Sequence, residues 1–248
     1  MSKSILFNSI KMNRNKLKSA FLYLLISLPC ISFAQQATCL IKGTIVDPKN
    51  EVQGIWLSHD GKQEELPIQN GEWVYSGVLV QPKIYGLIIK YKGGGHGEYF
   101  YLTSGAIQFE ISTVDSTLKF KVIGPQISKD YQEKLLEPVT YYQGQETKIK
   151  RLFLEAKKQN QPDTLQLKAD EQEAVNKCFN VPQLYIKANP GSPLCIPALN
   201  MLGNGKKGTP VTIDDLNRLF NSLSDSIKTS PEGLQYAEKL EKLKTTNQ

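Results

Sequence analysis

Apolar and polar residues alternate with a period of two from Cys39 to Gly124. This period sends successive side chains to opposite faces of a strand, and turn signals recur at roughly the 8 to 12 residue spacing of all-β sandwiches and barrels. Cys39, Ile41 and Ile45 share one face of the first expected strand. We expect about eight short strands over residues 35–125, forming an antiparallel β-sandwich or a flattened barrel.

Two dipeptides, Asp60-Gly61 and Asn70-Gly71, mark expected hairpins, because both central residues of a type I′ turn need positive φ. In the last two strands, one face is apolar and the other polar, which indicates a sheet with one solvated face. The apolar positions are Ile107, Phe109, Ile111, Leu118, Phe120 and Val122, and the polar ones are Gln108, Glu110, Lys119 and Lys121.

Gly124-Pro125 separates the strands from residues 126–248, where apolar residues recur at helical steps of three and four. The first helix should kink or break at Pro138, and a second should run from Asp163 or Thr164 toward Ala188 with a kink at Pro182. The apolar positions of the first are Ile127, Tyr131, Leu135, Val139, Tyr142, Ile149, Leu152, Phe153 and Ala156. Together with the strands, this predicts an α+β fold.

The segment YIKANPGSPLCIPAL, residues 185–199, is interpreted as a joint between two helices rather than a thiol site on a loop. Asn189-Pro190 should end one helix, and Ser192-Pro193 should begin the next as N-cap and first helical residue. Further starts are expected at the variant capping box Thr212 to Asp215 and at Ser230-Pro231. The expected apolar stripes are Leu194, Ala198, Met201 and Leu202; Leu216, Leu219, Phe220 and Leu223; and Leu234, Ala237, Leu240 and Leu243.

The N-terminus is typical of a secretory signal peptide over residues 1–34. Five basic residues without an acid precede the apolar run FLYLLISLPCISF and a small-residue cleavage site before Gln35. Met12 is an alternative start, and Pro29 disfavours lipid attachment at Cys30. The run of about fourteen residues is shorter than the roughly 20 needed to span a bilayer, and no later segment approaches that length.

Charge argues against nucleic acid as a partner. The chain has 30 Lys and Arg against 24 Asp and Glu, but removal of the signal peptide leaves 25 bases against 24 acids. The excess positive charge therefore belongs to the export signal, and no one-sided basic patch remains for phosphate binding.

Three cysteines follow the signal peptide, Cys39, Cys178 and Cys195, and none forms a Cys-x-x-Cys pair. Antiparallel helices leaving the joint would place Cys178 and Cys195 roughly 12 Å apart along the axis, beyond the ~7 Å limit for a disulfide. A kink at Pro182 could shorten this distance, so a bridge stays open as the alternative to two core thiols.

No catalytic, cofactor-binding or metal-binding residue is nominated. His59 and His96 are interpreted as solvated turn residues, which leaves no base for a Ser or Cys nucleophile. The glycine-rich segments at 93–97 and 203–208 are interpreted as a mobile hairpin end and a basic inter-helix loop. Strand aromatics should serve packing, with a ligand face as the alternative. They are Trp56, Trp73, Tyr85, Tyr91, Tyr99 and Tyr101.

The order of several segments resembles the N-terminal domain of unknown function that precedes thioredoxin-like disulfide reductases of the TlpA and AhpC/TSA type. These segments are CLIKGTI, GIWLS, IQNGEWVYSGVL, YFYLTSGAIQFEI, KFKVIGPQISKDYQE, YIKANPGSPLCIPAL and LSDSIKTSPEGLQYAEKL. In that family a Trp-Cys-x-x-Cys redox domain follows the last segment, whereas this sequence has no such motif. The resemblance implies an envelope protein of a Gram-negative bacterium, exported to the periplasm or cell envelope.

Three functions are consistent with these observations. The first is a non-catalytic, cofactor-free envelope module that binds another protein, which could be thioredoxin-like, or a small ligand. The second is a thiol-disulfide component acting through Cys178 or Cys195, or with a separate thioredoxin-like partner. The third is a sandwich that binds carbohydrate or another ligand through exposed aromatics.

Overall fold

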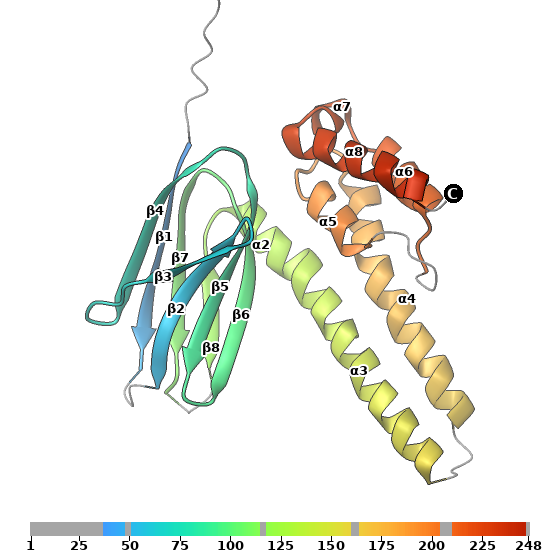
Figure 1. The fold of residues 1–248 in the computed structure, drawn as a ribbon, viewed down its shortest axis with the longest axis horizontal. Helices are drawn as coiled ribbons and strands as arrows, with labels where there is room; N and C mark the ends of the chain where they lie inside the picture. Colours follow the sequence, from blue (N-terminus) through green and yellow to red (C-terminus); the bar gives the residue numbers. More distant parts are fainter. Residues whose placement is uncertain (1–36, 48–50, 115–117, 160–163, 204–209, 247–248) are drawn as a thin grey trace, which may run out of the picture. The chain divides into compact units, whose positions relative to one another are not determined.

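The computed structural model describes residues 37–47, 51–114, 118–159, 164–203 and 210–246. Residues Ala37–Gln248 form one compact unit (Figure 1), and the expected signal peptide lies outside the described residues. The strands are β1 (Ala37–Val46), β2 (Val52–His59), β3 (Lys62–Leu66), β4 (Glu72–Leu79), β5 (Lys83–Tyr91), β6 (Gly94–Leu102), β7 (Gly105–Ser112) and β8 (Lys119–Ile123). The helices are α2 (Gln126–Tyr131), the π-helix η1 (Gln132–Leu136), α3 (Glu137–Lys158), α4 (Thr164–Ala188), α5 (Cys195–Met201), α6 (Ile213–Asn221), α7 (Asp225–Lys228) and α8 (Pro231–Thr246). The predicted α+β class is confirmed.

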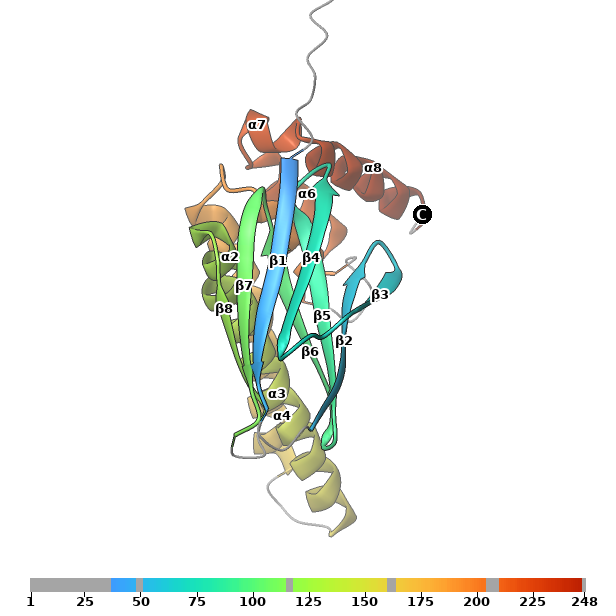
Figure 2. The ribbon, with the colours of Figure 1, turned by 90° about the vertical axis from the view of Figure 1, so that its left-hand side faces the viewer.

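The strands form two four-stranded sheets. Sheet A has the order β4-β1-β7-β8 and faces the viewer in Figure 2, and sheet B has the order β3-β2-β5-β6. The pairing of β1 with β7 is parallel, and the other pairings are antiparallel. The expectation of a wholly antiparallel arrangement is therefore wrong at this pair. All four strands of sheet B lie between β1 and β7 in sequence, so no hairpin dictates the relative direction of the two.

Both predicted turns are present, but only Asp60-Gly61 joins a hairpin, that of β2 and β3. Asn70-Gly71 is closed by the isolated bridge between Gln69 and Glu72 and leads from β3 in sheet B to β4 in sheet A, so the hairpin expected there is wrong. Asp60 and Gly61 have φ of 51° and 72°, and Asn70 and Gly71 have φ of 54° and 78°. These are the left-handed conformations that the two dipeptides were expected to adopt.

The two sheets share one hydrophobic core. Cys39 and Ile41 of β1 are at most 1% exposed, as are the predicted inward residues of β7. Phe100 of sheet B meets Phe109 of sheet A edge-on, with ring centroids 4.9 Å apart. On the outer face of sheet A, Lys121 and Glu110 form an ion pair at 3.0 Å, which confirms the solvated face of the last two strands.

A glycine makes room for the largest side chain in this core. Gly43 of β1 lies opposite Trp73 of β4 on one side and Phe109 of β7 on the other. A Cβ at Gly43 would lie 2.3 Å from the Trp73 indole, whose ring stacks on Phe109 at a centroid distance of 5.8 Å. The indole therefore packs directly on the β1 backbone.

Helices begin directly after Gly124-Pro125. Of the two outcomes expected at Pro138, a kink or a break, the break is wrong. Pro138 lies in the first turn of α3, which continues from η1 without an intervening loop. In η1 the Glu137 N–H donates to the Gln132 carbonyl, five residues back. Proline lacks an N–H and crowds the carbonyl four residues before it. The π turn has a wider, five-residue hydrogen-bond spacing, and this spacing falls directly before Pro138.

The second long helix, α4, begins at Thr164 and ends at Ala188, as predicted from Asn189-Pro190. It runs through Pro182 without ending and lies beside α3 (Figure 1). None of the helices in the described ranges combines the length and hydropathy that a membrane span requires.

Helix α5 begins at Cys195, three residues after the predicted cap at Ser192. Ser192 does accept a hydrogen bond from the Leu194 N–H at 3.2 Å, and its carbonyl accepts one from the Cys195 N–H at 3.0 Å. The second bond spans three residues, so the chain makes a tighter turn before the regular helix.

The two later starts are confirmed. Thr212 and Asp215 form a reciprocal capping box at α6, and the Ser230 hydroxyl accepts from the Gly233 N–H at 3.1 Å at the start of α8. The predicted stripe of α8 is wrong at Leu234, which is 55% exposed, whereas Tyr236 and Leu240 are buried. A Cβ at Gly233 would lie 2.1 Å from the Ile227 carbonyl oxygen, so this glycine faces α7 and rotates Leu234 outward.

The strands and helices meet along the β5–β6 edge of sheet B. Tyr101 of β6 is 2% exposed and packs into the helical core together with its strand partner Ile84. Along the same edge, the Ser128 hydroxyl donates to the Tyr101 carbonyl and the Gln132 amide donates to the Tyr99 carbonyl, both at 2.5 Å. Two helical side chains thus satisfy the outward carbonyls of an edge strand.

Candidate functional site

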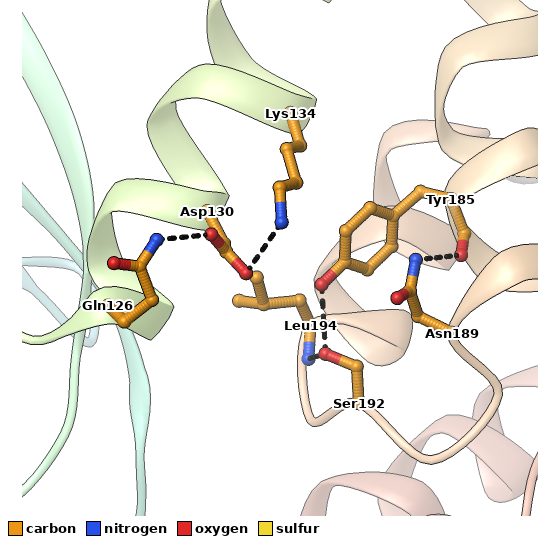
Figure 3. A network of polar contacts seen from close by, with 7 residues as sticks. All are labelled: Gln126, Asp130, Lys134, Tyr185, Asn189, Ser192 and Leu194. Carbon is orange, nitrogen blue, oxygen red and sulfur yellow. Dashed lines mark hydrogen bonds and ion pairs between the residues drawn. The ribbon is translucent and has the colours of Figure 1, made fainter.

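The joint at residues 185–199 is built by hydrogen bonds and apolar packing. The Tyr185 and Ser192 hydroxyls lie 2.9 Å apart, and the Asn189 amide donates to the Tyr185 carbonyl at 3.0 Å. Figure 3 shows this group facing a second one on α2 and η1, in which Asp130 accepts from Gln126 at 2.8 Å and pairs with Lys134 at 3.0 Å. The pKa of Asp130 is lowered by these two hydrogen bonds, first from Gln126 and then from Lys134.

The thiols are buried and unpaired. Cys39, Cys178 and Cys195 are free, and their sulfurs donate to three different backbone carbonyls, those of Gly77 (3.5 Å), Val139 (3.8 Å) and Asn189 (3.0 Å). The alternative of a Cys178–Cys195 bridge is thus contradicted, and the prediction of core thiols is confirmed. Burial raises the pKa of Cys195 to about 11, and it raises the pKa of the other two as well. Such thiols form little nucleophilic thiolate at neutral pH.

The histidines are strand residues, which corrects their prediction as solvated turn residues. His59 ends β2, its Nδ1 lies 3.3 Å from Asp60 Oδ2, and its ring lies 4.9 Å from that of Tyr85. His96 belongs to β6, and its Nε2 lies 3.2 Å from Glu98 Oε2. Among the described residues, the polar partner of each histidine ring is therefore a carboxylate.

The glycine-rich hairpin is shorter than predicted. Its turn is Lys92-Gly93, and the following glycines already belong to β6, where they pair with β5. Most of the basic inter-helix loop expected at 203–208 lies outside the described residues. Within the described ranges, no group of three or more His, Cys, Asp or Glu residues is placed to hold a metal ion.

The strand aromatics do not form one ligand face. Three of them, Trp73, Tyr85 and Tyr101, are at most 3% exposed, which confirms their packing role, whereas Tyr99 is 56% exposed. Trp56 and Tyr91 are half-buried, and the Lys90 ammonium lies 4.4 Å from the centre of the Trp56 ring. Tyr101 takes part in a different feature, the cavity described next.

A cavity of about 850 Å³ lies where the β5–β6 edge meets α5 and α8, and we call it the junction cavity. Its apolar lining is Pro82, Ile84 and Tyr101 from the strand side and Ile196, Pro197 and Leu243 from the helices. The cavity is well within the range of roughly 300–1,000 Å³ that holds drug-sized ligands. Segments up to about 160 residues apart in the chain therefore build one site.

Two polar atoms in the walls of this cavity have no hydrogen-bond partner among the described residues. They are Glu232 Oε1 and the Tyr236 hydroxyl, both fully buried and one helical turn apart on α8. Burial raises the pKa of Tyr236. Burial also raises the pKa of Tyr101, and the Glu232 carboxylate adds to that increase, which places the acid within electrostatic reach of Tyr101.

The lysines of the cavity include two with partners in this chain. Lys83 pairs with Asp60 at 2.5 Å, and Lys239 donates to Asn200 Oδ1 at 2.9 Å while lying 5.3 Å from the centre of the Tyr236 ring. Burial lowers the pKa of Lys239. Neither lysine forms an ion pair with Glu232.

Sequence reasoning missed the residues that distinguish this cavity. Glu232 and Tyr236 lie in the segment SPEGLQYAEKL, which was assigned only a helix start and an apolar stripe. The available signal was a glutamate and a tyrosine four residues apart, which share one helix face. That spacing is common on solvated helices, so only the position of α8 against the strands identifies the pair.

Comparisons of the chain with family models, curated protein sequences and solved structures gave no match. The resemblance to the domain that precedes thioredoxin-like reductases therefore stays a prediction, and the function is inferred from the cavity.

Proposed function

We propose that this chain is a non-catalytic, exported module of the bacterial envelope that binds its ligand in the junction cavity. The observation that carries the proposal is the cavity itself, which is large, combines apolar and charged walls, and contains two buried polar atoms without a partner among the residues that the structure describes. Burial without a hydrogen bond is costly, and such atoms are commonly retained where a ligand completes the bonding.

The fold supports a module built of two parts. The shared core of sheets A and B supports a β-sandwich, on which the helices form a second part. By its resemblance, this module is related to the N-terminal part of thioredoxin-like reductases, and an envelope protein is the proposed source of the ligand. The basic, apolar N-terminus supports export to the periplasm or cell envelope.

The buried thiols favour this function over the thiol-disulfide alternative. All three are nearly inaccessible, and their pKa values are raised rather than lowered. A redox thiol requires the opposite environment, which is partly exposed and electropositive. The division of the strand aromatics between core and surface likewise weakens the proposal of an aromatic carbohydrate face.

Site-specific photocrosslinking in intact cells tests the proposal. A benzophenone amino acid would replace Gln235, which lines the cavity, and in a matched control it would replace the adjacent Leu234, which is exposed outside it. We expect a discrete covalent adduct from position 235 and none from position 234. Equal adducts at both positions, or none at either, would contradict ligand binding in the cavity, and fractionation of the same cells would test export.

A further inference from the structure

The partnerless atoms of the junction cavity indicate which chemical group its ligand carries. Glu232 Oε1 is a carboxylate oxygen and can only accept hydrogen bonds, so its missing partner must be a donor. The position of Glu232 in the first turn of α8 explains why a negative charge is favourable there. It does not explain why one oxygen is buried without a donor, and that oxygen is the feature a ligand would complete.

The charge of Glu232 favours a cationic donor. Tyr101 and Tyr236 line the cavity together with Glu232, and no ion pair of this carboxylate is found among the described residues. A carboxylate beside aromatic rings attracts an organic cation through charge and through the negative faces of the rings. The chain already shows the second effect in this cavity, where the Lys239 ammonium lies 5.3 Å from the Tyr236 ring centre.

The same atoms distinguish between kinds of cation. A quaternary ammonium has no N–H group and would leave both Glu232 Oε1 and the Tyr236 hydroxyl without a partner. A primary ammonium has three N–H groups, enough to donate to both atoms. Lys239 does not fill this role, because among the described residues it donates to Asn200 at 2.9 Å and to neither of the two atoms.

We propose that the junction cavity binds a primary ammonium group, which donates hydrogen bonds to Glu232 Oε1 and to the Tyr236 hydroxyl. This inference rests on the proposed function, since it names the ligand chemistry of the same site. The cavity of about 850 Å³ is much larger than one ammonium group, so this group is one end of a larger ligand whose apolar part contacts Ile84 and Pro197. A lysine side chain of a peptide and a free alkylamine share this chemistry.

Calorimetric titration of the full chain, lacking only its export signal, tests the inference with four probes. Two are peptide-like, the capped tripeptide acetyl-Ala-Lys-Ala-amide and its trimethyllysine counterpart. Two are small molecules, hexylamine and hexyltrimethylammonium. We expect each primary amine to bind at least tenfold more tightly than its trimethylated partner, and the tighter of the two primary amines identifies peptide or free amine as the source.

Three isosteric variants complete the test. Glu232→Gln removes the charge and should weaken binding at least tenfold, and Tyr236→Phe removes only the hydroxyl and should weaken it about threefold or more. Glu241→Gln removes the same charge from a position of α8 outside the cavity lining, where Glu241 pairs with Lys244, and should change binding less than twofold. Thermal unfolding of each variant tests whether the fold is retained, which we expect because Glu232 Oε1 and the Tyr236 hydroxyl have no hydrogen-bond partner in the described part of the chain.

Several outcomes would overturn the inference. These are equal affinity for the trimethylated probes, unchanged binding by Glu232→Gln, equal losses in Glu232→Gln and Glu241→Gln, or no binding of any probe at about 20 mM. The crosslink at position 235 separates this failure from that of the proposed function. A crosslinked ligand that contains no amine would refute the proposed ammonium group and would still support ligand binding in the junction cavity.

Discussion

Strands β5 and β6 border both the core between the sheets and the junction cavity. The two regions differ in how completely their space is packed and their buried polar atoms are hydrogen-bonded. On the inner face of these strands, Phe100 packs against Phe109 of the opposite sheet. On the outer face, Tyr101 borders a cavity with a carboxylate oxygen and a hydroxyl that have no partner within the described ranges. The sheet core also holds a partnerless atom, Trp73 Nε1, but that indole is packed against Gly43 and Phe109.

This difference separates the part of the molecule that stabilises the fold from the part available for binding. Alternating apolar side chains that fill a core leave no vacancy for another molecule. A cavity that retains partnerless polar groups lowers stability, and such groups persist at functional sites. Changes that empty the first region and changes that fill or neutralise the second should therefore have opposite effects on stability.

The largest effect is expected at the centre of the sheet core. Phe109 is fully buried and contacts Trp73, Phe100 and Phe120. Phe109→Ala should lower the free energy of unfolding by about 3–5 kcal/mol, because it removes an aromatic ring from a closed core. Urea denaturation measures this change, and a loss below about 1 kcal/mol would show that the sheet core is not closely packed.

Substitutions of two glycines test how closely α8, which lines the junction cavity, packs against α7. Gly233→Ala should cost about 3 kcal/mol, because the new Cβ would lie 2.1 Å from the Ile227 oxygen and 2.7 Å from the Lys228 oxygen. Gly144→Ala in α3 is the matched control, since its Cβ meets open space, and it should raise stability by roughly 0.5–1 kcal/mol. Thermal unfolding of both variants measures the contrast, and shifts of the same sign would refute it.

Alkaline pH should destabilise the helical core through Cys195. The folded pKa of this thiol is about 11, against a usual value of 9.0. Between these values the folded state holds a proton that the unfolded state has lost, so stability falls as pH rises, by about 2 kcal/mol for this group. Denaturation of wild type and Cys195→Ala at pH 8 and at pH 11 measures this change. The difference in the free energy of unfolding between the two proteins should be smaller at pH 11 than at pH 8, and a difference independent of pH would contradict the assignment.

The smallest effect has the opposite sign. Tyr236→Phe removes a buried hydroxyl for which the described residues offer no partner, and in the absence of ligand it should raise the free energy of unfolding by about 1 kcal/mol. A rise of a few degrees in Tm is the expected result. Tyr185→Phe is the matched control, because its hydroxyl lies 2.9 Å from Ser192 and its loss should lower Tm. A rise in Tm for Tyr185→Phe as well would contradict this prediction.

Sequence reasoning recovered the elements whose determinants are local. Asp60-Gly61 and Asn70-Gly71 adopt the predicted positive φ, and Thr212 and Ser230 cap helices as expected. It failed where non-local packing decides the outcome. The direction of β1 against β7 is set between distant strands, and Gly233 turns α8 because the α7 backbone lies against it.

The junction cavity could not be predicted for the same reason. Its lining comes from β5, β6, α5 and α8, and each contribution looks ordinary in its own segment. Tyr101 was recognised as a packing residue, and it does pack, but into the helical core rather than between the sheets. A period of two assigns a side chain to one face of a strand without showing what covers that face.

The two hydrogen bonds from Ser128 and Gln132 to β6 have a consequence for how this chain can be divided. Without the helices, the Tyr101 and Tyr99 carbonyls would face solvent on an exposed strand edge, which is a template for pairing with other chains. Residues 37–124 expressed alone should therefore self-associate, and the helices prevent aggregation of the sheets in addition to forming one side of the cavity.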